Sequence, residues 1–168
     1  MPIILDPNKQ LINITCYYIE QIKPHGNSVF HFIKSAEELQ KFQNRGFVLE
    51  KDVQRNEAGK EATTPDKIIY TLETTWRTPT WRDQNTIFSK SIKHLPKPDG
   101  TSFSELDAIA YRDWKLKLCL KKWNILGPDQ KPMEVTEGLI DNLNPIVAQE
   151  LLAAFEKVSE PSDDELKN

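Results

Sequence analysis

The sequence predicts an α+β fold in which a small antiparallel sheet with one helix forms the N-terminal half and three to four helices follow. Up to about residue 76, apolar side chains largely alternate with polar ones, as in half-buried strands. From about residue 78 they recur every three or four residues, which is the period of an amphipathic helix. We expect a β-rich subdomain at 1–76, a helical subdomain at 77–158 and a disordered acidic tail at 159–168.

The N-terminal half contains four predicted strands and one predicted helix. The strands are expected where β-branched and aromatic residues gather, at 10–22, 28–34, 47–53 and 68–76. A turn at 24–27 joins the first two strands into a hairpin. Ser35 and Glu38 have the spacing of a capping box, and Gly46 suits the left-handed end of the helix that they begin. The polar residues 54–66 predict an exposed loop.

The C-terminal half is predicted to begin with an amphipathic helix over about 79–94. The residues on its apolar side recur at steps of four and three and are Trp81, Asn85, Phe88, Ile92 and Leu95. Asn85 is the one polar residue among them. The prolines and glycine of 95–103 predict a break in the chain. Thr136 predicts the cap of a short helix, and Asn144 followed by Pro145 predicts the start of the last helix.

The longest uninterrupted helical candidate is 104–125, which Ser104 is expected to cap and which has apolar side chains on two opposite sides. One side holds Leu106, Ile109, Leu116, Leu120 and Trp123. The other side holds Tyr111, Trp114 and Leu118. A surface helix ordinarily has one apolar stripe, so a helix with two either packs between layers or presents its second stripe to a partner. Both interpretations stay open from the sequence.

Charge is unevenly distributed along this chain, whose net charge is −3. Residues 76–128 carry 10 basic and 5 acidic side chains, whereas residues 129–168 carry 3 basic and 10 acidic ones. This difference predicts internal charge pairing or an interaction tail. The basic side chains of the central helix scatter around it and are Arg112, Lys115, Lys117, Lys121 and Lys122. Because they form no single stripe, we disfavour nucleic-acid binding.

The sequence lacks the common catalytic and cofactor motifs, including G-x-x-x-x-G-K-[S/T], G-x-G-x-x-G, H-E-x-x-H and C-x-x-C. We therefore predict no enzyme, no catalytic residue, no cofactor and no metal. Cys16 and Cys119 lie among apolar neighbours and predict buried free thiols in a cytosolic protein. No apolar run approaches the roughly 20 residues of a membrane span, and no secretory signal is expected.

Two polar residues are predicted to lie in apolar surroundings. His31 stands between two phenylalanines, which favours a partly buried, hydrogen-bonded core histidine over a metal ligand. Asp113 falls on the apolar side of the central helix and therefore needs a cation nearby. Lys117, four residues on, is the local candidate, and Arg77 or Arg82 of the preceding segment are the others.

Several short motifs follow one another in the C-terminal half. They are Trp123-Asn124-Ile125, Asp129, Pro132, Val135-Thr136 and Ile140-Asp141-Asn142-Leu143-Asn144-Pro145. Their order resembles that of the small tail assembly chaperones of tailed bacteriophages, over about residues 76–158. Gln130 or Lys131 replaces the glycine that this family usually has in its polar loop, and the β-rich first half is not part of the family pattern.

The resemblance implies a non-enzymatic protein that binds the tape-measure protein in the cytoplasm of the bacterial host and keeps it from aggregating. On this hypothesis the exposed contact patch consists of Tyr111, Trp114 and Leu118. The residues Leu151, Leu152 and Phe155 of the last helix either contribute to that patch or cover the core. The alternatives are a tail, neck or baseplate protein of the virion that forms a homo-oligomer and, less favoured, a nucleic-acid-binding regulator whose affinity falls steeply with salt.

Overall fold

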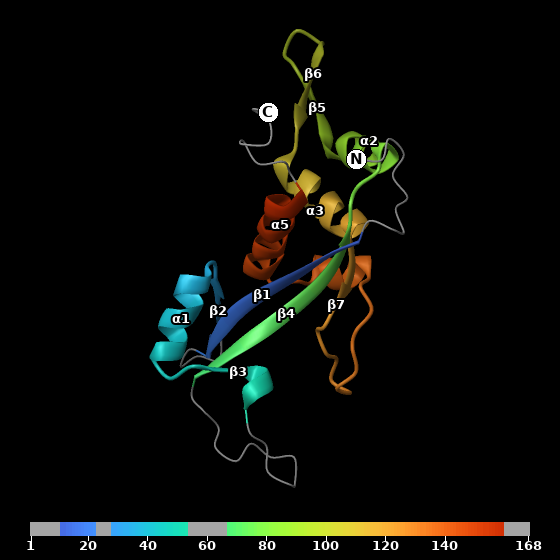
Figure 1. Ribbon diagram of the computed structural model, residues 1–168. Coiled ribbons are helices and arrows are strands. Elements are labelled where there is room, and N and C mark those ends of the chain that lie inside the picture. The colour runs from blue at the N-terminus through green and yellow to red at the C-terminus, as the bar shows by residue number, and fades with distance from the viewer. Residues whose placement is uncertain (1–10, 23–27, 54–66, 160–168) are drawn as a thin grey trace, which may run out of the picture. The chain divides into compact units, whose positions relative to one another are not determined.

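The computed structural model describes residues 11–22, 28–53 and 67–159, and it has the mixed α+β fold that the sequence predicts (Figure 1). The sheet order is β2-β1-β4-β3, and β7 also pairs with β4. The chain divides into two compact units. Unit 2 comprises the described residues of 15–73, and unit 1 comprises those before and after it, so the boundary falls within β1 and β4. The predicted tail and the predicted 54–66 loop lie outside the described residues, apart from Ser159.

The elements with residues in unit 2 are β1 (Leu11–Ile22), β2 (Ser28–Ile33), α1 (Ala36–Asn44), β3 (Val48–Leu49), the 3-10 turn Glu50–Asp52 and β4 (Ile68–Arg77). β2 runs antiparallel to β1, whereas β3 runs parallel to β4. Ser35 caps α1 by accepting a hydrogen bond from the Glu38 amide, and Gly46 adopts φ +85°, as predicted. The strand predicted at 47–53 is only two residues long, because the three charged residues that follow offer no apolar side chain to a sheet.

An aromatic cluster forms the centre of unit 2. The ring of Tyr18 stacks on Phe32 and on Tyr70, with centroid separations of 5.5 and 5.4 Å. Burial, followed by nearby acidic charges, raises the pKa of Tyr18 to about 12. The prediction of a core position for His31 is wrong: its side chain is 53% exposed and its Nε2 lies 3.0 Å from Glu38 Oε1. Successive side chains of a strand point to opposite faces, and the buried side chain here is that of Phe32, so its neighbour His31 points outward.

The elements of unit 1, besides the ends of β1 and β4, are α2 (Trp81–Ser91), β5 (Ile92–Pro96), β6 (Ser102–Leu106), α3 (Ala108–Cys119), β7 (Leu120–Trp123), α4 (Glu137–Asp141) and α5 (Pro145–Ser159). The predicted starts of the last two helices are confirmed. Thr136 accepts a hydrogen bond from the Leu139 amide, and Asn144 Oδ1 accepts one from the Ile146 amide.

The break predicted at 95–103 is instead a β-hairpin, and α2 ends at Ser91, before His94. β5 and β6 pair antiparallel, with Ile92 opposite Leu106 and Leu95 opposite Phe103. Gly100, at φ +80°, closes the turn, in which the Lys97 and Thr101 backbones are hydrogen-bonded. The turn residues that suggested an interruption therefore reverse the chain between two short strands.

The central helix is shorter than predicted, because α3 begins after Asp107 and ends at Cys119. Asp107, and not Ser104, is its cap: the carboxylate accepts hydrogen bonds from the amides of Ile109 and Ala110. The predicted five-residue stripe is consequently split among three elements, with Leu106 in β6 and both Leu120 and Trp123 in β7. Only Ile109 and Leu116 remain on the helix.

The core of unit 1 is built around two stacked aromatic rings. Trp76 of β4 and Phe155 of α5 are both fully buried, with ring centroids 4.5 Å apart and an interplanar angle of 10°. Trp76 Nε1 donates a hydrogen bond to Thr74 Oγ1, which donates in turn to the Ile14 carbonyl. The other buried apolar side chains around them include Ile87, Leu116, Leu120, Ile140, Leu151 and Leu152. Cys119 is also buried, whereas Cys16 is half-buried, and no disulfide joins them.

Candidate functional site

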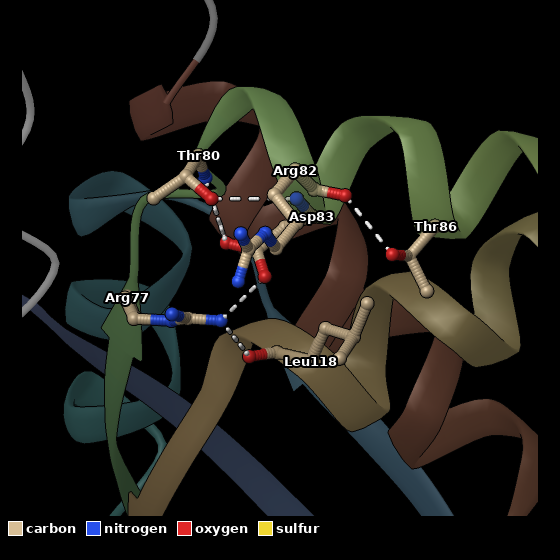
Figure 2. Close-up of polar contacts among 6 residues, drawn as sticks. All are labelled: Arg77, Thr80, Arg82, Asp83, Thr86 and Leu118. Atoms are coloured by element: carbon tan, nitrogen blue, oxygen red, sulfur yellow. Dashed lines mark hydrogen bonds and ion pairs between the residues drawn. The ribbon is translucent and has the colours of Figure 1, made fainter.

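A polar cluster anchors the start of α2 to the elements beneath it, as Figure 2 shows. The Asp83 carboxylate accepts hydrogen bonds from the Thr80 amide at 2.8 Å and from the Thr80 hydroxyl at 2.7 Å. Its other oxygen lies 2.9 Å from Arg77 Nη2, which also donates to the Leu118 carbonyl at 3.3 Å. Arg77 ends β4, Asp83 lies in α2 and Leu118 lies in α3, so this one cluster joins three elements of unit 1.

The electrostatics of this cluster indicate a structural role. Burial by itself raises the pKa of Asp83, but the hydrogen bonds from Thr80 and the charge of Arg77 outweigh it, so the pKa lies below its usual range. Burial, and then the Asp83 charge, raises the pKa of the neighbouring Cys119 thiol to about 11. The carboxylate is thus saturated with donors and the thiol stays protonated, which leaves neither group prepared for acid–base or nucleophilic work.

The two lysines of α3 pair with carboxylates within unit 1. Lys117 Nζ lies 2.8 Å from Asp113 Oδ2, which confirms the first of the three predicted cations, and 2.6 Å from Asp141 Oδ1. These two carboxylates raise the pKa of Lys117. Lys115 is buried and lies 2.8 Å from Glu156 of α5. Asp141 and Glu156 belong to the acidic last forty residues, so part of the predicted charge difference is neutralised internally.

The predicted contact patch of α3 is half-buried. Tyr111, Trp114 and Leu118 are all of intermediate exposure. The ammonium groups of Lys90 and Lys117 each lie 5.7 Å from the centroid of the Trp114 ring and cover part of it.

The last helix does not extend that patch. Leu151, Leu152 and Phe155 are buried in the core of unit 1. Of the two interpretations of these residues, covering the core is the one that their burial favours, because a side chain without exposed surface offers nothing to a partner.

Large apolar side chains are also exposed on α2, at the end of β6 and at the start of α3, which are successive elements of unit 1. They are Trp81, Phe88, Leu106 and Ile109, with exposed fractions of 80, 54, 49 and 79%. We call these four residues the 81–109 surface. The elements that carry them follow one another in Figure 1 and are hydrogen-bonded, since the Asp107 amide donates to the Ser91 carbonyl at 2.7 Å. Ile92, which follows α2, pairs with Leu106.

The sequence pattern identifies the apolar stripe of α2 without saying whether that stripe faces the core. The inward face of α2 instead carries Asp83, Ile87 and Ser91, at steps of four residues. A signal for this orientation is present in the sequence: Thr80 and Asp83 have the spacing of a capping box, which the structure contains. Because Asp83 is hydrogen-bonded to the cap residue Thr80 and paired with Arg77, the side of α2 that carries it faces the interior of the unit.

An open groove of about 400 Å³ lies elsewhere in unit 1, between β7 and the segment 132–135. Trp123, Met133 and Val135 supply apolar lining, and Trp123 Nε1 donates a hydrogen bond to the Met133 carbonyl at 2.7 Å. Lys121 also lines the groove, and burial followed by the charge of Arg77 lowers its pKa. The carboxylate of Glu134 lines the same groove, so its charge is mixed.

Comparisons with known proteins add no relative: no protein-family model, no curated protein and no solved structure matches this chain. Across residues 11–22, 28–53 and 67–159, no group of three or more His, Cys, Asp or Glu side chains is placed to hold a metal ion. No helix within those ranges has the length and apolar character needed to traverse a bilayer.

Proposed function

We propose that this chain is a non-enzymatic protein-interaction factor that binds its partner through the 81–109 surface. The observation that carries the proposal is the exposure of Trp81, Phe88, Leu106 and Ile109 on consecutive elements of one unit. Exposed apolar side chains that gather on one surface mark interaction sites, whereas isolated ones are ordinary. Covering a large, fully exposed apolar side chain contributes roughly 1.5–3 kcal/mol, so these four side chains supply part of the free energy that offsets the cost of association.

The ion pairs and the helix cap that hold the elements of this surface favour binding. The Arg77–Asp83 pair holds the start of α2, and the Asp107 carboxylate both caps α3 and lies 2.6 Å from Lys93 of β5. A surface that is already ordered loses less conformational entropy when it binds than one that must be ordered first. The exposed side chains are therefore held by elements that are already ordered before a partner binds.

The more specific proposal follows from the resemblance of residues 76–158 to the tail assembly chaperones. The partner is then the tape-measure protein of a phage tail, and the chain acts in the cytoplasm of the bacterial host. An exposed apolar surface suits a protein that shields an aggregation-prone partner. The excess of acidic side chains in 129–168 adds the net charge that keeps such a complex in solution.

A virion structural protein is the second candidate, and the β5–β6 hairpin favours it. The hairpin pairs with no further strand among the described residues, and every residue of β6 is exposed. An exposed strand edge is a template for pairing with another chain. A second copy of this chain is the simplest occupant in that case.

The test is light scattering coupled to size-exclusion chromatography, on the chain alone and after co-expression with the tape-measure protein of the same phage. We expect a small free species and a soluble complex. The double variant Trp81→Ser/Phe88→Ser should lose the complex. The control variant Gln84→Ser/Ser89→Ala, which changes two other exposed positions of α2, should retain it.

Two results would contradict the proposal in different ways. A ring or tube formed by this chain alone favours the virion structural protein instead. A complex that survives Trp81→Ser/Phe88→Ser while the fold is intact excludes the 81–109 surface as the binding site.

A further inference from the structure

The β5–β6 hairpin, whose turn projects away from α2 and α3 in Figure 1, has two outer edges. Each edge presents the backbone groups of alternate residues, because an antiparallel strand directs successive backbone groups to opposite sides. The Lys97 amide donates a hydrogen bond to the Thr101 carbonyl at one end of the hairpin, and the Asp107 amide donates to the Ser91 carbonyl at the other. These two inward pairs fix the alternation. The outward backbone groups therefore belong to Ile92, His94 and Pro96 on β5 and to Ser102, Ser104 and Leu106 on β6.

Proline obstructs the edge of β5 but not that of β6. Pro96 has no N–H, so the β5 edge lacks a donor that a neighbouring strand needs. The β6 edge keeps every outward donor and acceptor, and all five residues of β6 are exposed. Among the described residues, no strand other than β5 pairs with it. An additional strand therefore fits β6 and not β5.

The side chains of β6 suit a second copy of the same strand. Leu95 lies opposite Phe103 within the hairpin, and Phe103 is 42% exposed. If two β6 strands run antiparallel with Phe103 at the two-fold axis, the two phenylalanines form a non-hydrogen-bonded pair with Cα atoms about 4.5 Å apart. Ser102 of each copy then lies opposite Ser104 of the other, and the outward backbone groups of these serines exchange hydrogen bonds. Aromatic pairs at such positions stabilise a sheet.

The charges on the same face also fit a second copy. Glu105 is exposed and lies opposite Lys93, and the Lys97 ammonium group lies 5.7 Å from the centroid of the Phe103 ring. With Phe103 at the two-fold axis, Glu105 faces Thr101 of the second copy, whose neighbour across its own hairpin is Lys97. Each carboxylate is then placed between a lysine of its own chain and a lysine of the other, and no like charges stand opposite each other.

We propose that β6 pairs antiparallel with β6 of a second copy of this chain, centred on Phe103, so that two hairpins form one four-stranded sheet. The contact uses the same strand from both copies, so it closes after two chains and forms a dimer. This inference goes beyond the proposed function, because it concerns self-association and holds whether or not the 81–109 surface binds a partner.

The neighbouring registers fit less well. Centring the pair on Ser104 sets the Glu105 carboxylate against the Phe103 ring of the other copy, where it loses water without gaining a cation. Centring it on Glu105 sets two carboxylates opposite each other, which destabilises a sheet. The register centred on Phe103 is the one that pairs the aromatic rings and separates the like charges.

Sedimentation equilibrium of the full chain over a range of concentrations tests the association. We expect the average mass to rise from one copy toward two and no further. Phe103→Lys should raise the dissociation constant of the dimer about tenfold or more, because it removes the aromatic pair and sets two ammonium groups opposite each other. The control Val158→Lys adds the same charge at another exposed apolar position of unit 1 and should leave the dissociation constant unchanged. Circular dichroism confirms that each variant is folded.

Disulfide cross-linking tests the register while keeping Phe103. Ser102→Cys and Ser104→Cys are prepared as separate proteins, mixed and oxidised. Because Ser102 lies opposite Ser104 of the second copy, the mixture should form a cross-linked dimer, and neither variant should do so alone. The unchanged chain, with its native Cys16 and Cys119, is the blank for this measurement.

The contrary outcomes are distinct. A chain that stays monomeric at every concentration, a species larger than a dimer, or a dimer that Phe103→Lys does not weaken overturns the inference. Cross-linking of Ser104→Cys by itself overturns the register centred on Phe103. The tape-measure complex is measured separately with Phe103→Lys, and its formation shows that the proposed function stands without the dimer.

Discussion

Helices α5 and α2 belong to the same unit and show the same type of apolar periodicity, yet they use it in opposite ways. α5 turns its apolar face inward, where Leu151, Leu152 and Phe155 are buried. α2 turns its apolar stripe outward, leaving Trp81 and Phe88 exposed, and buries a face that contains a carboxylate and a hydroxyl. The periodicity of a helix therefore identifies its faces without deciding which of them the fold buries.

The neighbours of each helix account for the difference. Phe155 stacks on Trp76, so an apolar face meets an apolar core. On α2, Arg77 and Thr80 supply donors to Asp83, and Ser91 Oγ donates a hydrogen bond to the Ile87 carbonyl at 2.6 Å. Buried polar groups are tolerated when their hydrogen bonds are satisfied. The satisfied polar face can then face inward, and the apolar stripe is left exposed.

The largest expected effect separates the two helices directly. Phe155→Ala should lower the free energy of unfolding by about 3–5 kcal/mol, because it removes a fully buried ring that stacks on Trp76. Trp81→Ala should change it by less than about 0.5 kcal/mol, because the ring is mostly exposed. Urea denaturation followed by circular dichroism measures both. Comparable losses in the two variants would mean that the α2 stripe is part of the core.

A smaller effect is expected where α2 is anchored. Asp83→Ala should cost about 3 kcal/mol, because it leaves the mostly buried Arg77 guanidinium without its carboxylate. The double variant Arg77→Met/Asp83→Ala should be more stable than Asp83→Ala alone, since it removes the unpaired charge as well. Denaturant unfolding of the two single variants and the double variant gives the coupling energy. A coupling energy near zero would show that the pair does not hold α2.

The smallest effect is the pH dependence of that anchor. The folded-state pKa of Asp83 is depressed, so its contribution to stability is complete above the unfolded-state pKa of about 3.9 and is lost as pH falls through the lower folded value. Between about pH 5 and about pH 2.5, the free energy of unfolding should fall less in Asp83→Asn than in the unchanged chain. Equal losses in both proteins would place the acid-sensitive carboxylates elsewhere.

Helix starts were the features most readily predicted from the sequence. Ser35, Thr136 and Asn144 each cap the helix that follows, because a capping side chain bonds to a backbone amide only two or three residues away. The hairpin at 92–106 was missed, because two prolines and a glycine indicate a turn without saying whether the flanking residues pair. Pairing joins residues from six (Pro96 and Ser102) to fourteen (Ile92 and Leu106) positions apart, and patterns within a few residues do not report it.

Only part of the candidate site could be predicted from the sequence. The periodicity groups the residues of the α2 stripe, but it does not say that Trp81 and Phe88 are exposed. The sequence predicts a contact patch at Tyr111, Trp114 and Leu118; the structure leaves all three half-buried, with Lys90 and Lys117 over the ring of Trp114. Exposure is a property of what packs against a residue, and that depends on elements distant in sequence.

By itself, the sequence determined the α+β class, most helix starts and the apolar periodicity of α2 and α5, because these depend on side chains within a few residues of one another. The tertiary structure alone decided which face of each helix is buried. That choice followed from Arg77 meeting Asp83 and from Trp76 meeting Phe155, contacts between residues of different elements. Side chains that come together only in the folded chain therefore set the surface on which the proposed function depends.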